Sequence, residues 1–329
     1  MAEKSTPKTG FTRDGASNLD QTLRPQSWGE YVGQEKTKEN LRILLTAARD
    51  RGHAAEHILL YGPPGLGKTT LAHLVAKTLG TNMRTTSGPA IERVGDLAAI
   101  LTNLSPGDVL FIDEIHRLSK SIEEVLYPAM ESGVLDIIIG KGPSARTVQL
   151  ELPPFTLVAA TTRISLLSAP LRSRFSGGTF RLDFYTDEEI AQILERSAAL
   201  LGVPIDSTLR AQIAKRCRAT PRTANYLLKR CRDLAQLEGC ALDEAIIDRT
   251  FALLEIDSIG LTGPDRRLLE ALIHKFGGGP VGLNTMAAST GEEMATIEDV
   301  IEPYLIRQGL IERTPRGRVA TAHAYAHIA

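Results

Sequence analysis

One short segment constrains the fold of this chain more than any other. Residues 62–70 read Gly-Pro-Pro-Gly-Leu-Gly-Lys-Thr-Thr and match the pattern GxxxxGK[ST] of a phosphate-binding loop. The uniformly apolar run 57–61 precedes it and is typical of a buried strand, and a helical stripe of leucine and valine at 71, 74, 75 and 79 follows. This strand–loop–helix context predicts a P-loop within a parallel-sheet α/β domain.

The residue types of this loop predict its chemistry. Gly62, Gly65 and Gly67 would let backbone N–H groups turn onto phosphate oxygens at a helix N-terminus. Lys68 would reach the β- and γ-phosphates, and Thr69, followed by Thr70, would ligate Mg²⁺ through its hydroxyl. We therefore expect ATP and Mg²⁺ at this loop.

Two more apolar runs predict neighbouring strands of the same sheet. Residues 109–112 end in Asp113-Glu114, where Asp113 would hold the hydrated magnesium and Glu114 would activate the attacking water. Residues 157–160 end in Thr161-Thr162, and Thr162 is the preferred polar sensor of the γ-phosphate. Each pair has a plainer alternative, because acids and threonines are also common helix caps.

Patterns along the chain divide it into segments. Residues 1–20 are polar and aperiodic and are predicted to be a flexible tail of a large domain that reaches residue 185. Within that domain, residues 135–152 contain a Gly-Lys-Gly-Pro turn followed by alternating apolar positions, which predicts a projecting hairpin. Residues 186–256 have helical periodicity throughout, and residues 257–329 follow as a third domain.

The last segment has the pattern of a winged helix. Helices are expected over 265–276 and 283–289, and a capping box from Thr290 to Glu293 predicts the start of a third helix with an apolar stripe from 297 to 305. The turn 314–317 then predicts a small hairpin.

Charge is close to balanced overall but not in this hairpin. The chain of 329 residues has 38 Lys+Arg and 39 Asp+Glu, a formal net charge of -1, so binding of nucleic acid requires a local patch. The segment 307–318 contains one acid, Glu312, and four arginines: Arg307, Arg313, Arg316 and Arg318. Arg313, Arg316 and Arg318 are the expected DNA contacts, since arginines can bind phosphates without reading bases. The alternative is a solvated charged turn.

Several classes of protein are disfavoured. The three cysteines lack the spacing of a zinc site, the seven histidines form no HExxH pattern, and no long apolar span is present. We expect a cytoplasmic protein with no membrane segment, in which the cysteines fill helix interfaces.

The motifs together resemble the AAA+ ATPases, and within them the RuvB family of bacterial Holliday-junction motors. The segments that carry the likeness are GPPGLGKTT, LFIDEIHRL, AATTR, PLRSRF, ATPRTAN, IIIGKGPSAR and FGGGPVGLNTMAA. The resemblance covers residue 23 to the C-terminus. It implies a P-loop AAA+ parallel-sheet domain with a β-hairpin insert, a small all-helical lid and a C-terminal winged helix.

The resemblance also implies site residues. Arg174 matches the family's arginine finger, which acts on the ATP of a neighbouring subunit in a homohexamer, with Arg172 as the second choice. The alternative for Arg174 is a surface arginine in an ion pair. Pro221 and Arg222 match the sensor 2 motif of the lid. The expected contacts to the adenine and the interdomain hinge are Leu23, Arg24, Tyr31, Val32 and Tyr185, with ordinary packing as the alternative for the two tyrosines.

The expected partners follow from the same resemblance. They are RuvA, which would dock on hairpin 135–152 through Ile137, Ile138 and Ile139, the nuclease RuvC, and the duplex arms of four-way DNA junctions. The alternative for the hairpin is a plain extension of the sheet. The implied activity is ATP-driven branch migration in recombination, DNA repair and the SOS response. The chain departs from the family at 175–181, next to Arg174, and lacks an aromatic residue after Glu131.

Two other functions remain open on the sequence alone. A clamp-loader-like assembly factor would use ATP mainly to set its shape. A nucleotide-sensing transcription regulator would use the winged helix to read bases.

Overall fold

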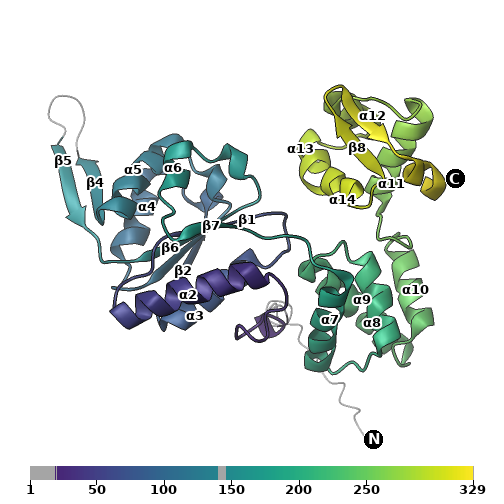
Figure 1. Cartoon of the computed structure of the whole chain (residues 1–329), viewed down its shortest axis with the longest axis horizontal. Helices are drawn as coiled ribbons and strands as arrows, with labels where there is room; N and C mark the ends of the chain where they lie inside the picture. The colour runs from purple at the N-terminus through teal and green to yellow at the C-terminus, as the bar shows by residue number, and fades with distance from the viewer. Residues whose placement is uncertain (1–18, 20, 140–145, 329) are drawn as a thin grey trace, which may run out of the picture.

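The computed structural model describes residue 19, residues 21–139 and residues 146–328, without the side chains of 137–139 and 147. The chain forms a large α/β part, a helical part and a C-terminal part with a small hairpin (Figure 1). The strands are β1 Ile58–Tyr61, β2 Met83–Ser87, β3 Val109–Asp113, β4 Val134–Ile139, β5 Arg146–Glu151, β6 Thr156–Thr161, β7 Gly178–Arg181, β8 Ile311–Thr314 and β9 Gly317–Ala320.

The helices fall into the same three parts. Those of the large part are α2 Glu35–Arg51, α3 Lys68–Leu79, α4 Val94–Thr102, α5 Lys120–Glu131 and α6 Ala169–Ser173. Those of the helical part are α7 Asp187–Leu201, α8 Ser207–Arg216, α9 Pro221–Glu238 and α10 Glu244–Leu253. Those of the C-terminal part are α11 Gly263–Glu270, α12 Leu283–Thr290, α13 Met294–Thr296, α14 Glu302–Arg307 and α15 Ala322–Ile328.

The large part is built on a parallel sheet with the strand order β2-β3-β6-β1-β7. The apolar runs predicted as central strands form β1, β3 and β6, which confirms the predicted fold class. The two edge strands were not predicted, because β2 is mostly polar and β7 has only Phe180 as a large apolar residue. Strand β7 lies within residues 175–181, where the sequence is expected to depart from the family pattern, so residues 178–181 of that segment are part of the sheet.

Alternating side chains of the central strands pack against two helical layers. Leu60, Phe111 and Ala160 share one core with α2 and α3. Leu59, Ile112 and Ala159 share the other with α4 and α5. Burial on both faces explains the continuous apolar runs of these strands. Because the strands pair in parallel, their carboxyl ends lie at a common edge of the sheet.

The predicted hairpin is present. Strands β4 and β5 pair antiparallel from Val134↔Glu151 to Ile139↔Arg146 and project from the large part (Figure 1). The turn 140–145 and the side chains of Ile137, Ile138 and Ile139 lie outside the described residues, as does nearly all of the tail 1–20. The expectations for these residues stay predictions.

The helical part is a bundle of α7 to α10. Helix α7 begins with a capping box, in which Thr186 and Glu189 bond to each other's backbone N–H groups, and it ends at Gly202 in the left-handed conformation. Cys217 and Cys231 are buried in the bundle, and burial raises the pKa of Cys217 to about 12. Cys240 is exposed, so the prediction that cysteines fill helix interfaces is wrong for that residue.

The C-terminal part is a winged helix with its own core and with hairpin β8–β9 as predicted. The capping box at Thr290 is wrong: Thr290 ends α12, where its Oγ1 donates to the carbonyl of Met286, and α13 begins only at Met294. The third predicted helix is wider in its middle, since Ile297–Ile301 is π-helical. Helix α15 was not predicted.

No helix among the described residues is long and apolar enough to cross a membrane. The predicted domain boundaries after 185 and 256 remain predictions.

Candidate functional site

The P-loop lies between β1 and α3 and takes the backbone shape that its glycines permit. Gly62, Gly65 and Gly67 have φ values of 140°, 83° and 95°. A Cβ on Gly67 would lie 2.8 Å from the Tyr31 hydroxyl oxygen, and one on Gly62 would lie 2.5 Å from the Leu182 carbonyl oxygen. Glycine is therefore required here for both conformation and space, and the loop has a backbone shape compatible with the predicted phosphate cradle.

Lys68 is the first residue of α3 and turns back over the loop. Its Nζ donates to the carbonyl oxygens of Gly62 at 2.8 Å and Pro63 at 2.9 Å. Burial lowers the pKa of Lys68 to about 8, while Asp113 and Glu114 oppose that shift. The lysine therefore lies at the loop, close to the two carboxylates that were predicted to act with it.

The acidic pair stands where β3 ends, beside the end of β6. The Oδ1 of Asp113 accepts from the backbone N–H of Glu114, at 3.0 Å. Glu114 has a φ of 50°, a left-handed conformation that is uncommon for a residue with a side chain. Strain of this kind is often found at active sites.

The two candidate sensor threonines differ in environment. The Thr162 hydroxyl donates to Glu114 Oε2 at 3.3 Å, and both residues line the cavity described below. Thr161 is buried, and its hydroxyl contacts His116 Nδ1 at 2.9 Å. His116 Nδ1 lies 3.2 Å from Glu114 Oε2, and burial lowers its pKa. The geometry favours Thr162 as the sensor, with Thr161 behind it.

Two tyrosines join the P-loop to the start of the helical part. The hydroxyls of Tyr31 and Tyr185 each donate to the Leu66 carbonyl, at 3.2 and 3.3 Å, and they lie 3.2 Å apart. Burial raises the pKa of Tyr185 to about 12, and it also raises the pKa of Tyr31 well above its ordinary value. Both line the cavity described next, so packing and a ligand contact are compatible roles for them.

A cavity of about 480 Å³ lies between the P-loop and the helical part. Its lining includes most of the predicted nucleotide contacts, from segments far apart in sequence: Leu23, Arg24, Tyr31, Val32, Gly65, Gly67, Lys68, Thr69, Thr70, Asp113, Glu114, Thr162, Tyr185, Pro221 and Arg222. Its volume lies within the 300–1,000 Å³ range of ligand pockets. Gly62 is not part of the lining but accepts the Lys68 hydrogen bond.

Some lining residues were missed. Arg196 of α7 donates to the carbonyl oxygens of Leu23 and Arg24 and pairs with Glu30 at 2.6 Å, so it holds the N-terminal segment over the cavity. Asn225, Tyr226 and Lys229 also line it. These three follow Arg222 at i+3, i+4 and i+7, a helical spacing that could have revealed them. No local signal marks Arg196.

Arg174 is not among the residues that line this cavity. Its guanidinium pairs with Glu131 at 3.1 Å, donates to the Pro170 carbonyl at 2.7 Å and stacks on Tyr127 at 4.4 Å. The Tyr127 hydroxyl is held in turn by Ser168 and the buried Glu123. Arg174 is therefore held by Glu131, Pro170 and Tyr127, outside the lining of its own chain's cavity. Arg172 was the second choice for this role.

The arginines of the wing are held differently from one another. Arg318 is only 7% exposed, and its guanidinium binds Glu302 Oε2 at 3.0 and 2.7 Å. The prediction that Arg318 lies on a DNA-binding surface is wrong, because β9 carries it inward. Arg313 is exposed and pairs with Glu298 at 3.4 Å. Arg316 is exposed at the hairpin turn, and Arg307 stacks on Phe184 and donates to the Tyr185 carbonyl.

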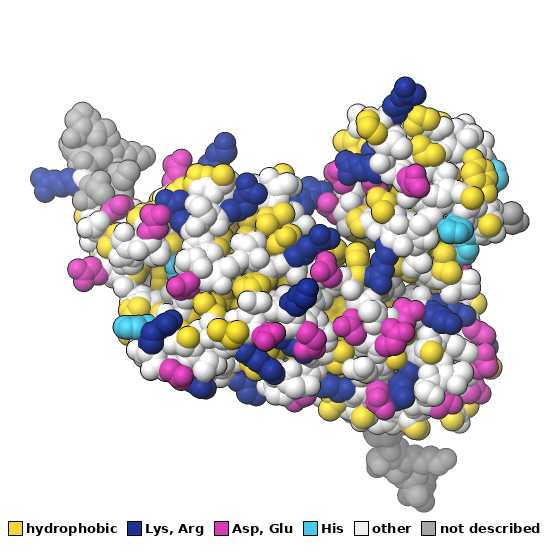
Figure 2. Space-filling view, viewed as in Figure 1, with side chains coloured by type: hydrophobic (Ala, Val, Ile, Leu, Met, Phe, Trp, Pro, Cys, Tyr) yellow, Lys and Arg dark blue, Asp and Glu magenta, His cyan; other side chains and the backbone are white. Residues whose placement is uncertain are grey.

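Figure 2 shows Lys and Arg side chains interspersed with acidic ones over the visible surface, without a continuous basic face. A DNA contact on this side would therefore involve individual arginines.

The residues around Lys68 fit a magnesium nucleotide. Asp113 and Thr69 supply the hard oxygen ligands that Mg²⁺ prefers, and both line the cavity beside the P-loop. A side chain at Gly62 would clash with the Leu182 carbonyl, and one at Gly67 would clash with the Tyr31 hydroxyl, so neither glycine of the loop can be replaced without a shift.

Three family models match consecutive stretches of the chain. They describe the Holliday junction DNA helicase RuvB P-loop domain over residues 23–182, the RuvB AAA lid domain over 185–257 and the RuvB C-terminal winged helix domain over 258–329.

Individual relatives agree. The chain is 58% identical to the Holliday junction branch migration complex subunit RuvB of Dehalococcoides mccartyi, over 95% of this chain and 89% of the relative. A solved structure of the RuvB Holliday junction branch migration motor of Thermotoga maritima is 49% identical, covers 93% of this chain and 98% of its own, and superimposes with a TM-score of 0.85. A single-residue variant of that motor reaches 0.86 at the same identity and coverage. With the P-loop cavity, the helical lid and the winged helix in place, these matches show that the chain belongs to the RuvB family of AAA+ ATPases.

Proposed function

We propose that this chain is an ATP-driven motor that moves duplex DNA and so drives branch migration at four-way junctions. The observation that carries the proposal is the cavity in which P-loop, acidic pair, polar sensor and lid arginine meet. A winged helix on the same chain gives such an ATPase a surface for DNA. The relatives' names, which refer to the Holliday junction and to a branch migration complex, support the same reading.

The residues of the cavity divide the chemistry between them. Backbone N–H groups of the P-loop and Lys68 bind the β- and γ-phosphates, and Glu114 orients the attacking water and accepts its proton. The Thr162 hydroxyl, bonded to Glu114, fixes that carboxylate relative to the γ-phosphate. Magnesium, held by Thr69 and Asp113, would neutralise phosphate charge when bound.

The lid would sense the nucleotide. Pro221 begins α9 and sets Arg222 at its first turn, and the Arg222 backbone N–H bonds to the Gly65 carbonyl of the P-loop at 3.4 Å. Arg222 would contact the phosphates from the lid side, while Leu23, Arg24, Tyr31, Val32 and Tyr185 would enclose the base and ribose. A change at the γ-phosphate would then alter the angle between lid and P-loop.

The site would be completed by a neighbour. We propose a homohexameric ring in which Arg174 acts on the ATP of the adjacent subunit, because it stacks on Tyr127 outside the lining of its own chain's cavity. Hairpin 135–152 would dock RuvA, and RuvC would join the complex on the junction.

Arg313 and Arg316 would contact DNA phosphates. We further propose that the protein is cytoplasmic and that its three domains cover residues 1–185, 186–256 and 257–329.

The test is a branch-migration assay with purified protein, RuvA, ATP and a synthetic four-way junction whose dissociation is followed on a gel. The proposal expects ATP-dependent dissociation that Lys68→Ala abolishes, with Arg249→Ala on the lid surface as the control. Dissociation that persists in Lys68→Ala, or a wild-type protein that hydrolyses ATP without moving the junction, would reject the motor in favour of an ATP-dependent assembly factor.

A further inference from the structure

Three consecutive residues of the winged helix contact three different parts of the molecule. Glu298, Asp299 and Val300 lie in the π-helical segment Ile297–Ile301. Such wide turns are rare and are often found at functional sites. We call Glu298–Val300 the junction turn. Each of its residues is bound by a different arginine.

The first contact joins the junction turn to the catalytic edge of the sheet. Asp299 forms an ion pair with Arg163, which directly follows the sensor Thr162. The backbone N–H of Arg163 also donates to the Thr161 hydroxyl at 3.0 Å. Because the Thr162 hydroxyl bonds to Glu114, a displacement of the Arg163 main chain would reach the catalytic carboxylate through a single intervening residue, Thr162.

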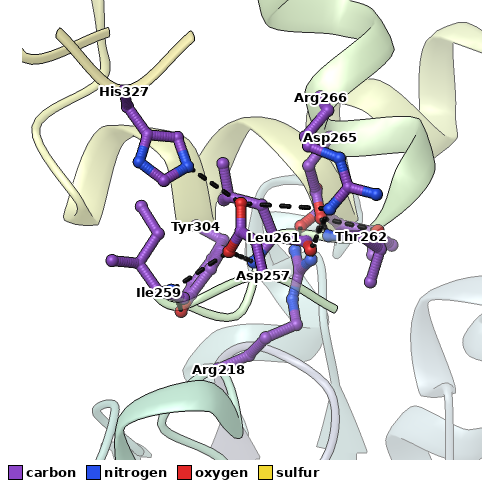
Figure 3. A network of polar contacts seen from close by, with 10 residues as sticks. Arg218, Asp257, Ile259, Leu261, Thr262, Asp265, Arg266, Tyr304 and His327 are labelled. Atoms are coloured by element: carbon purple, nitrogen blue, oxygen red, sulfur yellow. Dashed lines mark hydrogen bonds and ion pairs between the residues drawn. The ribbon is translucent and has the colours of Figure 1, made fainter. Parts of the chain in front are cut away.

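The second contact joins the junction turn to the lid. Arg218 donates from Nη2 to the Val300 carbonyl at 2.9 Å and from Nη1 to the fully buried Asp265 at 2.5 Å, and it stacks on Tyr304 at 4.3 Å. Figure 3 shows Arg218 reaching from the lid towards Asp265 and Tyr304 of the winged helix.

Arg218 stands close to the lid's nucleotide contact in sequence. It lies four residues before Arg222, and it and Ala219 have φ values of 57° and 53°. Two successive left-handed residues with side chains are costly, so tertiary contacts must hold this bend. The Ala219 carbonyl accepts from the Tyr185 backbone N–H at 3.1 Å, which ties the bend to the hinge as well.

The third contact faces the wing. Glu298 pairs with Arg313, an exposed arginine of β8, at 3.4 Å. A phosphate can replace a carboxylate as the partner of an arginine, since both accept charge-assisted hydrogen bonds from it. Binding of DNA to Arg313 would thus act directly on the residue next to Asp299.

We propose that the junction turn transmits DNA contact at the wing to both nucleotide sensors, with Arg163 and Arg218 as positioning residues. This proposal rests on the proposed motor function. A shift of the turn would move Arg163, which is next to Thr162 in sequence and thereby linked to Glu114. The same shift would move Arg218, which lies four residues before Arg222. DNA on the wing and ATP in the cavity therefore bias the same element, which is what coupling between two sites requires.

The experiment measures ATP turnover of the full-length protein with and without saturating duplex DNA. The variants are Asp299→Ala, Arg163→Ala, the double variant and the charge swap Arg163→Asp with Asp299→Arg. Both side chains are about one-third exposed, at 30% and 34%, so neither single change strands a buried charge. Arg249→Ala, which removes a lid ion pair with Glu238, is the matched control.

The expected result is a fall of about fivefold or more in the ratio of DNA-stimulated to DNA-free turnover for each single variant, the lower end of usual coupling factors. The ratio of the double variant should fall no further than that of either single variant, and the charge swap should recover the wild-type ratio. Asp299→Ala should keep DNA-free turnover within about twofold, because the ion pair of Asp299 is with Arg163, which does not line the cavity. Singles that keep the wild-type ratio would overturn the proposal. So would singles whose turnover falls equally with and without DNA, or whose ratio the swap fails to recover. A wild-type protein that DNA does not stimulate would instead reject the motor itself.

Discussion

The P-loop cavity and the β8–β9 wing hold their charged side chains in opposite ways. In the cavity, Lys68 bonds to backbone carbonyls, Asp113 and Glu114 line the wall beside it, and Glu114 accepts from the Thr162 hydroxyl. In the wing, Arg318 is buried on Glu302 and Arg313 pairs with Glu298. The cavity directs its charge towards a ligand, whereas the wing uses most of its charge internally. No ion pair involves Arg316 in the described part of the chain.

This difference explains how specific each region is. A triphosphate needs several groups fixed in one geometry, and a cavity with left-handed glycines and a strained Glu114 provides them. A motor that moves along any sequence needs only phosphate contacts without base readout. Arg316, together with Arg313, which could exchange Glu298 for a phosphate, suits that task. The following predictions test the contrast, from the largest expected effect to the smallest.

The largest effect should come from Arg174. Arg174→Ala should lower ATP turnover by about 10³- to 10⁵-fold, the usual range for an arginine finger. Nucleotide affinity should stay close to wild type, because Arg174 does not line its own chain's cavity. Turnover by a coupled phosphate-release assay and binding of a fluorescent ATP analogue measure the two quantities. Arg172→Ala is the control, and a larger loss there would transfer the role to Arg172.

The carboxylate beside the sensor should follow. Glu114→Gln should lower turnover by about 10²- to 10⁴-fold, as expected on losing a general base, while leaving ATP bound. The isosteric amide keeps the contact with Thr162 but cannot accept a proton. Single-turnover kinetics isolate the chemical step, and an unchanged rate there would show that another group activates the water.

In the wing, the buried arginine should matter for stability. Arg318→Ala would leave Glu302, itself only 2% exposed, with the more distant Arg313 Nε at 3.8 Å as its cationic partner, and breaking a buried pair in this way costs about 3–5 kcal/mol in the free energy of unfolding. The double change Arg318→Met with Glu302→Leu should recover most of that loss. Chemical denaturation measures both. A loss below about 0.5 kcal/mol, typical of surface changes, would mean that Arg318 is exposed in solution.

The exposed arginine of the turn should matter only for DNA. Arg316→Ala should leave the unfolding free energy unchanged and reduce the slope of log affinity against log salt by about one unit, the loss of one phosphate contact. Titration of a fluorescent duplex at several salt concentrations gives the slope. An unchanged slope would remove Arg316 from the interface and leave Arg313 as the remaining candidate.

The contrast between the two regions also shows what sequence can predict. The P-loop, Asp113 and Glu114 were predictable because phosphate chemistry fixes residue types at a fixed local spacing, and apolar runs placed them at strand ends. Tyr31, Tyr185 and Arg222 came from family resemblance, since no local pattern links them. Arg196 was missed because it reaches the cavity from a different helix.

The errors in the wing have one physical cause. Counting charges from 307 to 318 gave an excess of arginine but left out Glu298 and Glu302, which a preceding helix brings against the hairpin. The error at Thr290 has a local cause instead, because Thr290 is the last residue of α12 and its hydroxyl bonds to the Met286 carbonyl one turn back in that helix. Local spacing predicts elements well, while the partner of a charged side chain depends on tertiary packing.

The central claim is that a working site combines the cradle of one subunit with Arg174 of its neighbour. Mixing Lys68→Ala and Arg174→Ala proteins tests it most directly, because each lacks a different half of the site. In a ring with head-to-tail interfaces and random order, about a quarter of the interfaces would pair an intact cradle with an intact arginine. The account predicts that two inactive proteins recover a comparable fraction of wild-type ATP turnover when mixed. A mixture as inactive as its components would contradict it.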